Sequence, residues 1–183
     1  MNVMKEIEFE IEGIAPLKMD RFHGLPDPKT PEGYRKQAEE KCYRDEEGNL
    51  AIPASALKAC MRLASSELGK KTDAKKNRQA IAAGVFFKET MFSLGKKEHD
   101  GIVEDLVTRG KGDKVTRVIT YRPHIKEWKI GGRMYVMGIP VQFVKQAFEL
   151  GGIKYGLLGH RPEFGRFIIK KFEVIEDGKK GTR

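Results

Sequence analysis

Cysteine is scarce in this sequence, since its 183 residues include only Cys42 and Cys60. Two cysteines are too few for a disulfide framework, and their spacing matches no metal-binding pair. A disulfide-stapled secreted domain is therefore excluded. We expect both thiols to be unpaired and the protein to work in a reducing compartment, the cytoplasm.

Long apolar runs are also missing. No stretch approaches the roughly 18 residues that span a membrane. Residues 1–12 carry carboxylates, whereas an export signal has a basic region followed by an apolar one. We therefore expect neither secretion nor a membrane partner.

Acidic residues are outnumbered by 35 Lys and Arg to 26 Asp and Glu, which gives a formal charge of +9 and a pI of about 9.5. This excess of positive charge favours a polyanionic partner. The length of the chain and its 39% of hydrophobic residues suffice for one core. We therefore expect a single domain over residues 1–183.

The hydrophobic pattern predicts both strands and helices. Ile7, Phe9 and Ile11 alternate with glutamates, a period of two that predicts a strand over residues 3–13. Apolar residues recur at helical spacing after Pro53, and Gly69 is expected to end that helix. The other expected elements are a loop at 14–31, a short helix at 32–41, a solvated connector at 70–78, strands at 84–92, 121–138 (with a bulge) and 164–175, and a helix from Pro140 to Gly151. The buried candidates of the last strand are Phe167, Ile169, Phe172 and Val174.

This order of elements predicts an α+β fold, the βαββαβ arrangement of ferredoxin-like and RNA-recognition (RRM) domains. The polar, glycine-punctuated residues 93–120 interrupt it as a long insertion, in which we expect a β-hairpin around residues 103–120. Residues 176–183 are expected to form a flexible tail.

Positive charge is concentrated in residues 106–133, which contain eight basic residues and two acidic ones. Lysine and arginine neutralise phosphates irrespective of base sequence, and Tyr121 and Trp128 offer rings on which bases can stack. An ordinary solvated face is the alternative interpretation. The candidate nucleic-acid contacts are Arg109, Lys111, Lys114, Arg117, Arg122, Lys126 and Trp128.

The start of the helix after Pro53 is a second candidate site. Its first amides have no partner within the helix, and the helix dipole adds partial positive charge, so an anion such as phosphate fits there. Ser55, Lys58 and Arg62 are the candidate contacts. A capped helix without a ligand explains the same residues.

A third candidate site is the glycine-rich segment 151–166. Glycine lets a backbone approach a ligand closely, and basic side chains between the glycines supply hydrogen-bond donors. The segment matches neither a Walker loop nor a dinucleotide fingerprint, and a tight turn before the last strand is an equal alternative. The candidate residues are Lys154, Gly156, Gly159, His160, Arg161, Gly165 and Arg166.

Two of these segments resemble motifs of one family. IPASALKACMR (52–62) is similar to the motif IPGSSLKGALR of the RAMP superfamily, and GLLGHRPEFGRF (156–167) is similar to its carboxy-terminal glycine-rich loop. IEGIAPLKMDRF (11–22) and YRPHIKEW (121–128) extend the resemblance over most of the chain. Together they are similar to small phage and prophage proteins related to the backbone subunits of class 1 CRISPR complexes.

This resemblance implies a modified RRM domain with a basic thumb-like insertion, which grips single-stranded RNA or DNA along a polymer of subunits in a bacterial, archaeal or phage-infected cell. It implies that Ser55, Lys58 and Arg62 line the backbone of the strand. Arg21, in the loop after the first strand, is a further candidate contact. Gly156, Gly159, Gly165 and Arg166 would form the glycine-rich loop. Ala54, Ala56 and Ala59 depart from the motif, which has Gly, Ser and Gly there.

Some RAMP relatives cleave RNA with a loop aspartate or a histidine, so Asp20 and His23 are weak catalytic candidates. General acid–base catalysis needs positioned partners, whereas the four histidines are widely separated and no residue set resembles a zinc or magnesium site. We expect no metal and no cofactor. The prediction is therefore sequence-independent single-strand binding by an oligomer; the alternatives are an endoribonuclease and a phage assembly protein that binds no nucleic acid.

Overall fold

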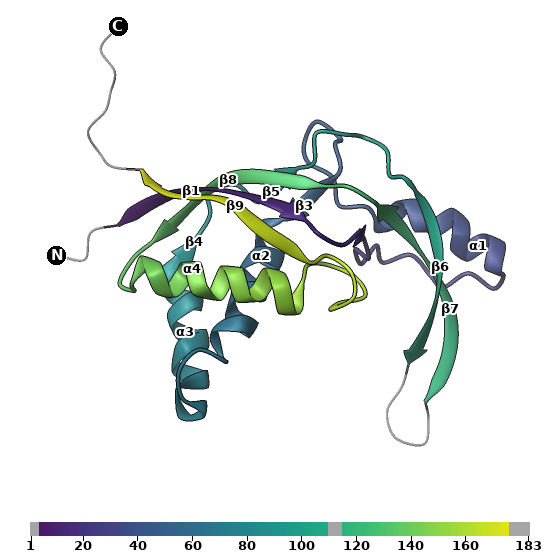
Figure 1. The fold of residues 1–183 in the computed structure, drawn as a ribbon. Helices are drawn as coiled ribbons and strands as arrows, with labels where there is room; N and C mark the ends of the chain where they lie inside the picture. The colour runs from purple at the N-terminus through teal and green to yellow at the C-terminus, as the bar shows by residue number, and fades with distance from the viewer. Residues whose placement is uncertain (1–3, 110–114, 176–183) are drawn as a thin grey trace, which may run out of the picture.

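The computed structural model describes residues 4–109 and 115–175, and its main element is a four-stranded sheet (Figure 1). The strands lie in the order β4-β8-β1-β9, and every neighbouring pair is antiparallel. The central strands are β1 (Lys5–Gly13) and β8 (Lys129–Val136). The edge strands are β4 (Val85–Phe86) and β9 (Phe167–Ile175).

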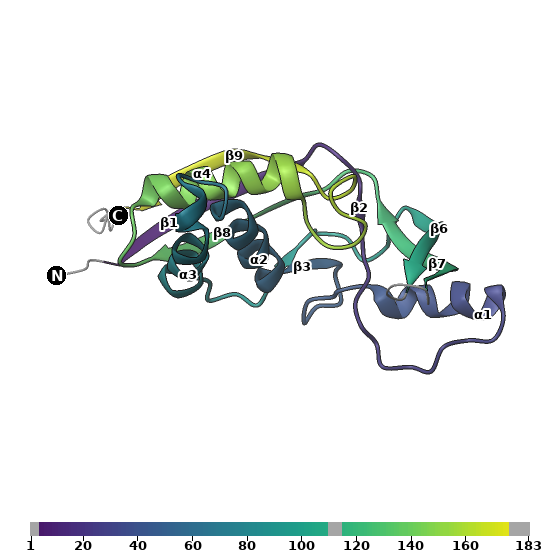
Figure 2. The ribbon, with the colours of Figure 1, turned by 90° about the horizontal axis from the view of Figure 1, so that it is seen from below.

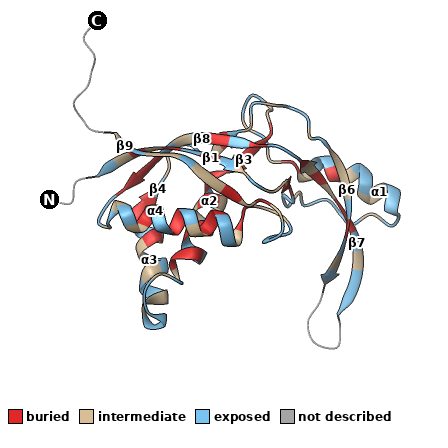
Figure 3. Ribbon diagram, viewed as in Figure 1, coloured by how far each residue is buried: buried red, intermediate tan, exposed pale blue. Residues whose placement is uncertain are grey.

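Helices α2 (Ala54–Ser65), α3 (Ala74–Gly84) and α4 (Val141–Leu150) cover one face of this sheet (Figure 1). The alternation in β1 explains why, because Ile7, Phe9 and Ile11 are buried under the helices while the intervening glutamates point to the open face. The buried positions accordingly gather where the helices meet the strands (Figure 3).

A hairpin of β6 (Gly101–Arg109) and β7 (Thr116–Ile125) extends away from the sheet (Figures 1 and 2). The short strand β2 (Leu17–Lys18) pairs with the last two residues of β7, so the loop after β1 holds the base of the hairpin. Helix α1 (Pro31–Lys36) lies beside the hairpin and continues as a 3-10 turn.

A second, smaller strand pair consists of β3 (Ala51–Pro53) and β5 (Met91–Ser93). Because β3 runs directly into α2, this pair fixes where α2 begins. The amide of Ala54, the first residue of α2, donates to the carbonyl of Thr90 next to β5 at 2.9 Å.

Several predictions from the sequence are confirmed. The chain is α+β, residues 3–13 contain β1, a helix follows Pro53, and a hairpin lies in the region predicted around 103–120. Cys42 and Cys60 are unpaired and buried, and burial raises the pKa of the Cys60 thiol to about 12. No helix within residues 4–109 and 115–175 has the length and hydropathy to cross a membrane.

Other predictions were wrong. Residues 70–78 are no connector, because they contain a 3-10 turn and most of the first two turns of α3. The strand predicted at 84–92 is two short strands in different sheets, β4 and β5, and the one predicted at 121–138 is split between β7 and β8. The apolar pattern did not reveal these breaks, since both sides of each break are partly buried.

Three details also need correction. The register shift lies in the β1–β9 pair, between Glu10 and Ile11, whereas β1 and β8 pair in continuous register. Gly151 does not end α4, which continues as a π-turn over Gly151–Tyr155. Val174, predicted to be buried, is 42% exposed because β9 forms an edge of the sheet there. The predicted tail, 176–183, lies outside the described residues.

Candidate functional site

A groove of about 1240 Å³ lies between α2 and the segment that follows α4. The exposed side of α2 forms one wall, with Ser55, Ala56, Ala59 and Leu63. The other wall is formed by Lys154, Tyr155, Leu158, Gly159, His160, Arg161 and Pro162, and Asp20, Tyr43, Pro53 and Met91 complete the lining. The structure thus brings together two segments that the sequence singled out separately.

The wall formed by α2 is mostly made of small side chains. Pro53 has extended backbone angles and precedes the first helical residue, so the helix begins immediately after β3. Ala56 and Ala59, which depart from the family motif, both line the groove. Their methyl groups add little bulk, so the groove remains wide at these positions.

Two cations of α2 lie beside the groove. Lys58 and Arg62 follow Ser55 and Ala59 by three residues each, so the helical repeat places them next to those groove-lining residues, on the side away from Ala56. Arg62 is exposed and Lys58 half-buried. Neither side chain has a hydrogen bond or ion pair with any described residue.

The glycine-rich loop (residues 156–166) is held against its own chain. Leu157 donates to the carbonyl of Gly165 at 2.9 Å, Gly165 donates to Pro16 at 2.8 Å and Gly159 donates to Lys18 at 2.9 Å. Gly156 and Gly165 have φ values of +71° and +74°, and a Cβ on Gly165 would lie 2.1 Å from the Leu157 carbonyl oxygen. At Gly156 and Gly165, glycine therefore permits a close approach of the chain to itself.

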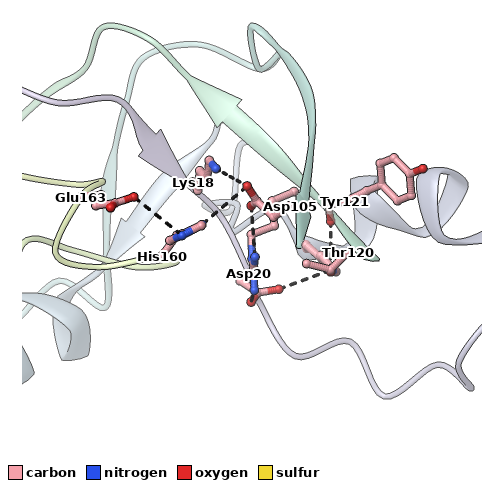
Figure 4. Close-up of polar contacts among 9 residues, drawn as sticks. Lys18, Asp20, Asp105, Thr120, Tyr121, His160 and Glu163 are labelled. Carbon is pink, nitrogen blue, oxygen red and sulfur yellow. Dashed lines mark hydrogen bonds and ion pairs between the residues drawn. The ribbon is translucent and has the colours of Figure 1, made fainter. Parts of the chain in front are cut away.

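A cluster of ion pairs joins the hairpin to β2 and to Asp20 just after it, next to this loop (Figure 4). The Lys18 ammonium lies 2.5 Å from Oδ1 of Asp105 and 3.8 Å from the centre of the Phe164 ring. Arg122 binds the other oxygen of Asp105 at 3.1 Å and Asp20 at 2.7 Å. Asp20 also pairs with Lys41 at 3.4 Å.

The charges in this cluster stabilise one another. Burial by itself would raise the pKa of Asp105, but hydrogen bonds from Lys18 and Arg122 outweigh burial, and the pKa is lowered. Burial would likewise lower the pKa of Arg122, and its bonds to Asp20 and Asp105 raise it instead. His160, on the groove wall, reaches the same carboxylate with Nδ1 3.5 Å from Oδ1 of Asp105.

The cluster was not expected from the sequence. Lys18 and Asp105 were not candidates, since a lysine between Leu17 and Met19 and an aspartate within a strand give no local signal. Arg122, predicted to contact nucleic acid, has instead its Nη atoms bound to two carboxylates within the protein.

The predicted stacking rings are buried and require correction. Trp128 is 5% exposed and its indole nitrogen donates to the carbonyl of Ala15 at 2.9 Å. Tyr121 is 6% exposed and its hydroxyl donates to Glu104 at 2.9 Å. Neither ring presents a face to solvent, because both pack where the hairpin meets the rest of the chain.

The remaining candidates lie at separate places. Arg117 and Lys126 are exposed on β7 and just after it, and Arg109 is on β6. Lys111 and Lys114 lie outside the described residues. Arg161 is exposed on the groove wall, and Nε of Arg166 donates to the carbonyl of Pro162 at 2.6 Å.

The two weak catalytic candidates line a second pocket of about 380 Å³, together with Arg21 and Phe22. His23 accepts the Leu25 amide at Nδ1, and Arg21 donates to the carbonyl of Glu40 at 3.2 Å. Within the described ranges, no three His, Cys, Asp or Glu side chains are grouped so as to hold a metal ion.

No protein-family model matches the sequence, and neither does any curated protein. Among solved structures, the chain is similar to a chain in the cryo-electron microscopy structure of the type III-B Cmr-beta bound to cognate target RNA, with a TM-score of 0.53 and 16% identity over 94% of this chain. It is also similar to Cmr6 from Pyrococcus furiosus, with a TM-score of 0.47 and 12% identity over 92% of this chain and 99% of that one.

This chain spans 61% of the length of the Cmr-beta chain that it matches. The likeness extends over nearly the whole of the shorter chain, so the two share a fold. This shared fold agrees with the resemblance predicted from the short motifs.

Proposed function

We propose that this chain binds single-stranded nucleic acid, with RNA as the first candidate, along the groove between α2 and the glycine-rich loop. The observation that carries the proposal is that these two segments, about a hundred residues apart in the sequence, form opposite walls of one groove. Arg161 lies on one wall, and Arg62 and Lys58 lie beside the other. Cations on both sides suit a phosphate backbone that runs between them.

The chemistry of the groove lining supports the same partner. Ala56, Ala59, Leu63 and Leu158 are apolar, and Ser55 and Tyr43 add hydroxyl groups. Sugars and bases have apolar faces that such a surface can cover, while the cations at the rim neutralise phosphates. Contacts of this kind do not read base edges, so we propose binding that is independent of base sequence.

The open face of the sheet is unsuited to a polyanion. Glu6, Glu8 and Glu12 point to that face and pair with Arg133, Lys171 and Lys170 across the strands. Cations engaged in this way are not available to phosphates, and the negative charge of the glutamates repels phosphates. The proposed path of the strand therefore runs along the helical side of the molecule.

We further propose that the core is a modified RRM domain whose insertion is the hairpin. The succession β1, α2, β4, β8, α4, β9 and the strand order β4-β8-β1-β9 support this arrangement. The cognate target RNA bound in the Cmr-beta structure supports RNA as the ligand. We propose that several copies assemble on one strand, and the exposed Leu106 and Ile119 of the hairpin are a candidate contact between copies.

The test compares two double variants in binding to a fluorescent single-stranded RNA. Arg62→Gln with Arg161→Gln removes one cation on each side of the groove, and Lys5→Gln with Lys129→Gln removes two exposed cations on strands of the sheet. We expect the first pair to weaken binding about tenfold or more for all base sequences, and the second to leave it nearly unchanged.

Equal affinity of the two variants would overturn the placement of the strand. Absence of binding by the unaltered protein would overturn the function and favour an assembly protein. Cleavage of the RNA that is lost in Asp20→Ala or His23→Ala would replace the proposal with an endoribonuclease.

A further inference from the structure

Helix α3 carries positive charge that the groove does not use. Residues 58–78 contain seven basic residues and two acidic ones, an imbalance close to that of residues 106–133. On α3, Lys75, Lys76 and Arg78 are all exposed. None of the three side chains forms a hydrogen bond or ion pair with a residue in the described part of the chain.

The three cations share one side of α3. The helical repeat puts Lys75 between Lys76 and Arg78 around the helix axis, while the buried Ile81 and the half-buried Asn77 lie on the opposite side. Asn77 fastens that side by donating to the carbonyl of Leu68 at 2.6 Å. The basic side of α3 is therefore held in one orientation toward solvent.

Helix α3 is a neighbour of the helix that carries Lys58 and Arg62. Helix α2 packs against both α3 and the π-turn before the glycine-rich loop, and it lies between α3 and that loop when the molecule is seen from below (Figure 2). Cys60 of α2 contacts Gly151 of the π-turn, whereas Lys58 and Arg62 lie on other sides of α2. Lys58 and Arg62 thus belong to the helix that lies between the groove and α3.

We propose that α3 is a second contact surface for the same nucleic-acid strand, which leaves the groove past Arg62 and Lys58 and runs over Lys75, Lys76 and Arg78. The partner is a single-stranded polyanion, chosen because three unpaired cations on one side of α3 complement phosphates and because α3 packs against the helix that borders the proposed groove. This inference rests on the proposed function. It adds that the binding site is longer than the groove and that affinity depends on the length of the strand.

The test uses single-stranded oligonucleotides of about 4 and about 16 nucleotides, the span of known single-strand site sizes. The variant Lys75→Gln, Lys76→Gln, Arg78→Gln is compared with Lys5→Gln, Lys97→Gln, Lys129→Gln, which removes three exposed cations elsewhere. Glutamine preserves helix propensity, so α3 should remain folded, and circular dichroism checks this.

We expect the α3 variant to bind the long oligonucleotide about tenfold more weakly than the control variant, with a smaller dependence on salt, and to bind the short one equally well. Equal loss for both lengths, or no loss for either, would overturn the role of α3 while leaving the groove intact. If the unaltered protein binds neither length, the proposed function itself fails. A loss of self-association in the α3 variant with unchanged oligonucleotide binding would assign this surface to a protein partner instead.

Discussion

Lys18 and Asp105 form a buried ion pair, with the ammonium nitrogen 2.5 Å from a carboxylate oxygen and side-chain exposures of 3% and 6%. The two residues are 87 positions apart. Lys18 belongs to the short strand at the base of the hairpin and Asp105 to the hairpin itself, and His160 connects them to the groove wall. This pair therefore holds the hairpin at a defined position relative to the groove.

Removal of the Lys18 ammonium should be costly. In Lys18→Met the Asp105 carboxylate stays buried with fewer partners, and we expect a loss of about 3 kcal/mol in the free energy of unfolding, measured with urea. The exposed Lys97→Met is the control, with an expected change below about 0.5 kcal/mol. A loss for Lys18→Met as small as that of the control would show that the pair does not stabilise the fold.

The same carboxylate predicts how stability depends on pH. The pKa of Asp105 is lower in the folded chain than in the unfolded one, so its stabilising effect is complete above the ordinary aspartate pKa of about 4 and is lost as the pH falls through the folded pKa. Other carboxyls with lowered pKa values, such as Glu67 and Asp100, titrate in the same range. We therefore expect the free energy of unfolding to fall from about pH 5 to about pH 3, and to fall less steeply in Asp105→Asn. Parallel pH profiles would contradict this assignment.

A comparison of two glycines distinguishes the cost of backbone strain from the cost of steric crowding. Gly165 and Gly95 have φ values of +74° and +69°, but a Cβ would clash with Leu157 only at Gly165 and meets nothing within 4 Å at Gly95. We expect Gly95→Ala to cost about 1 kcal/mol from the backbone alone. Gly165→Ala should cost at least about 2 kcal/mol more, because the glycine-rich loop must move. Similar thermal unfolding of the two variants would show that the loop is not held as described.

Regular patterns in the sequence were sufficient to predict much of the fold. The alternation around Phe9 and the helical spacing after Pro53 each lie within one element and depend on burial of one face. The breaks between β4 and β5 and between β7 and β8 were missed, because pairing partners far along the chain decide where a strand changes sheet. Local periodicity carries no information about such partners.

The groove residues could be predicted because they lie in local motifs, whereas the ion pairs of the hairpin could not. Ser55 and Arg161 belong to short motifs that can be read locally. The basic residue Arg122 looked equally suited to phosphate, but its carboxylate partners Asp20 and Asp105 come from distant segments. Only the folded arrangement distinguishes a cation used inside the protein from one that faces a ligand.

The central claim is that this chain binds a single strand through its phosphate backbone. Its most direct test is the affinity for single-stranded RNAs of unrelated base sequence, measured by fluorescence anisotropy over a range of salt concentrations. We predict similar affinities for all sequences and a logarithm of the binding constant that falls linearly with the logarithm of salt concentration, by about 0.7 per phosphate contacted. Affinity that does not change with salt, or no binding at low salt, would contradict the account.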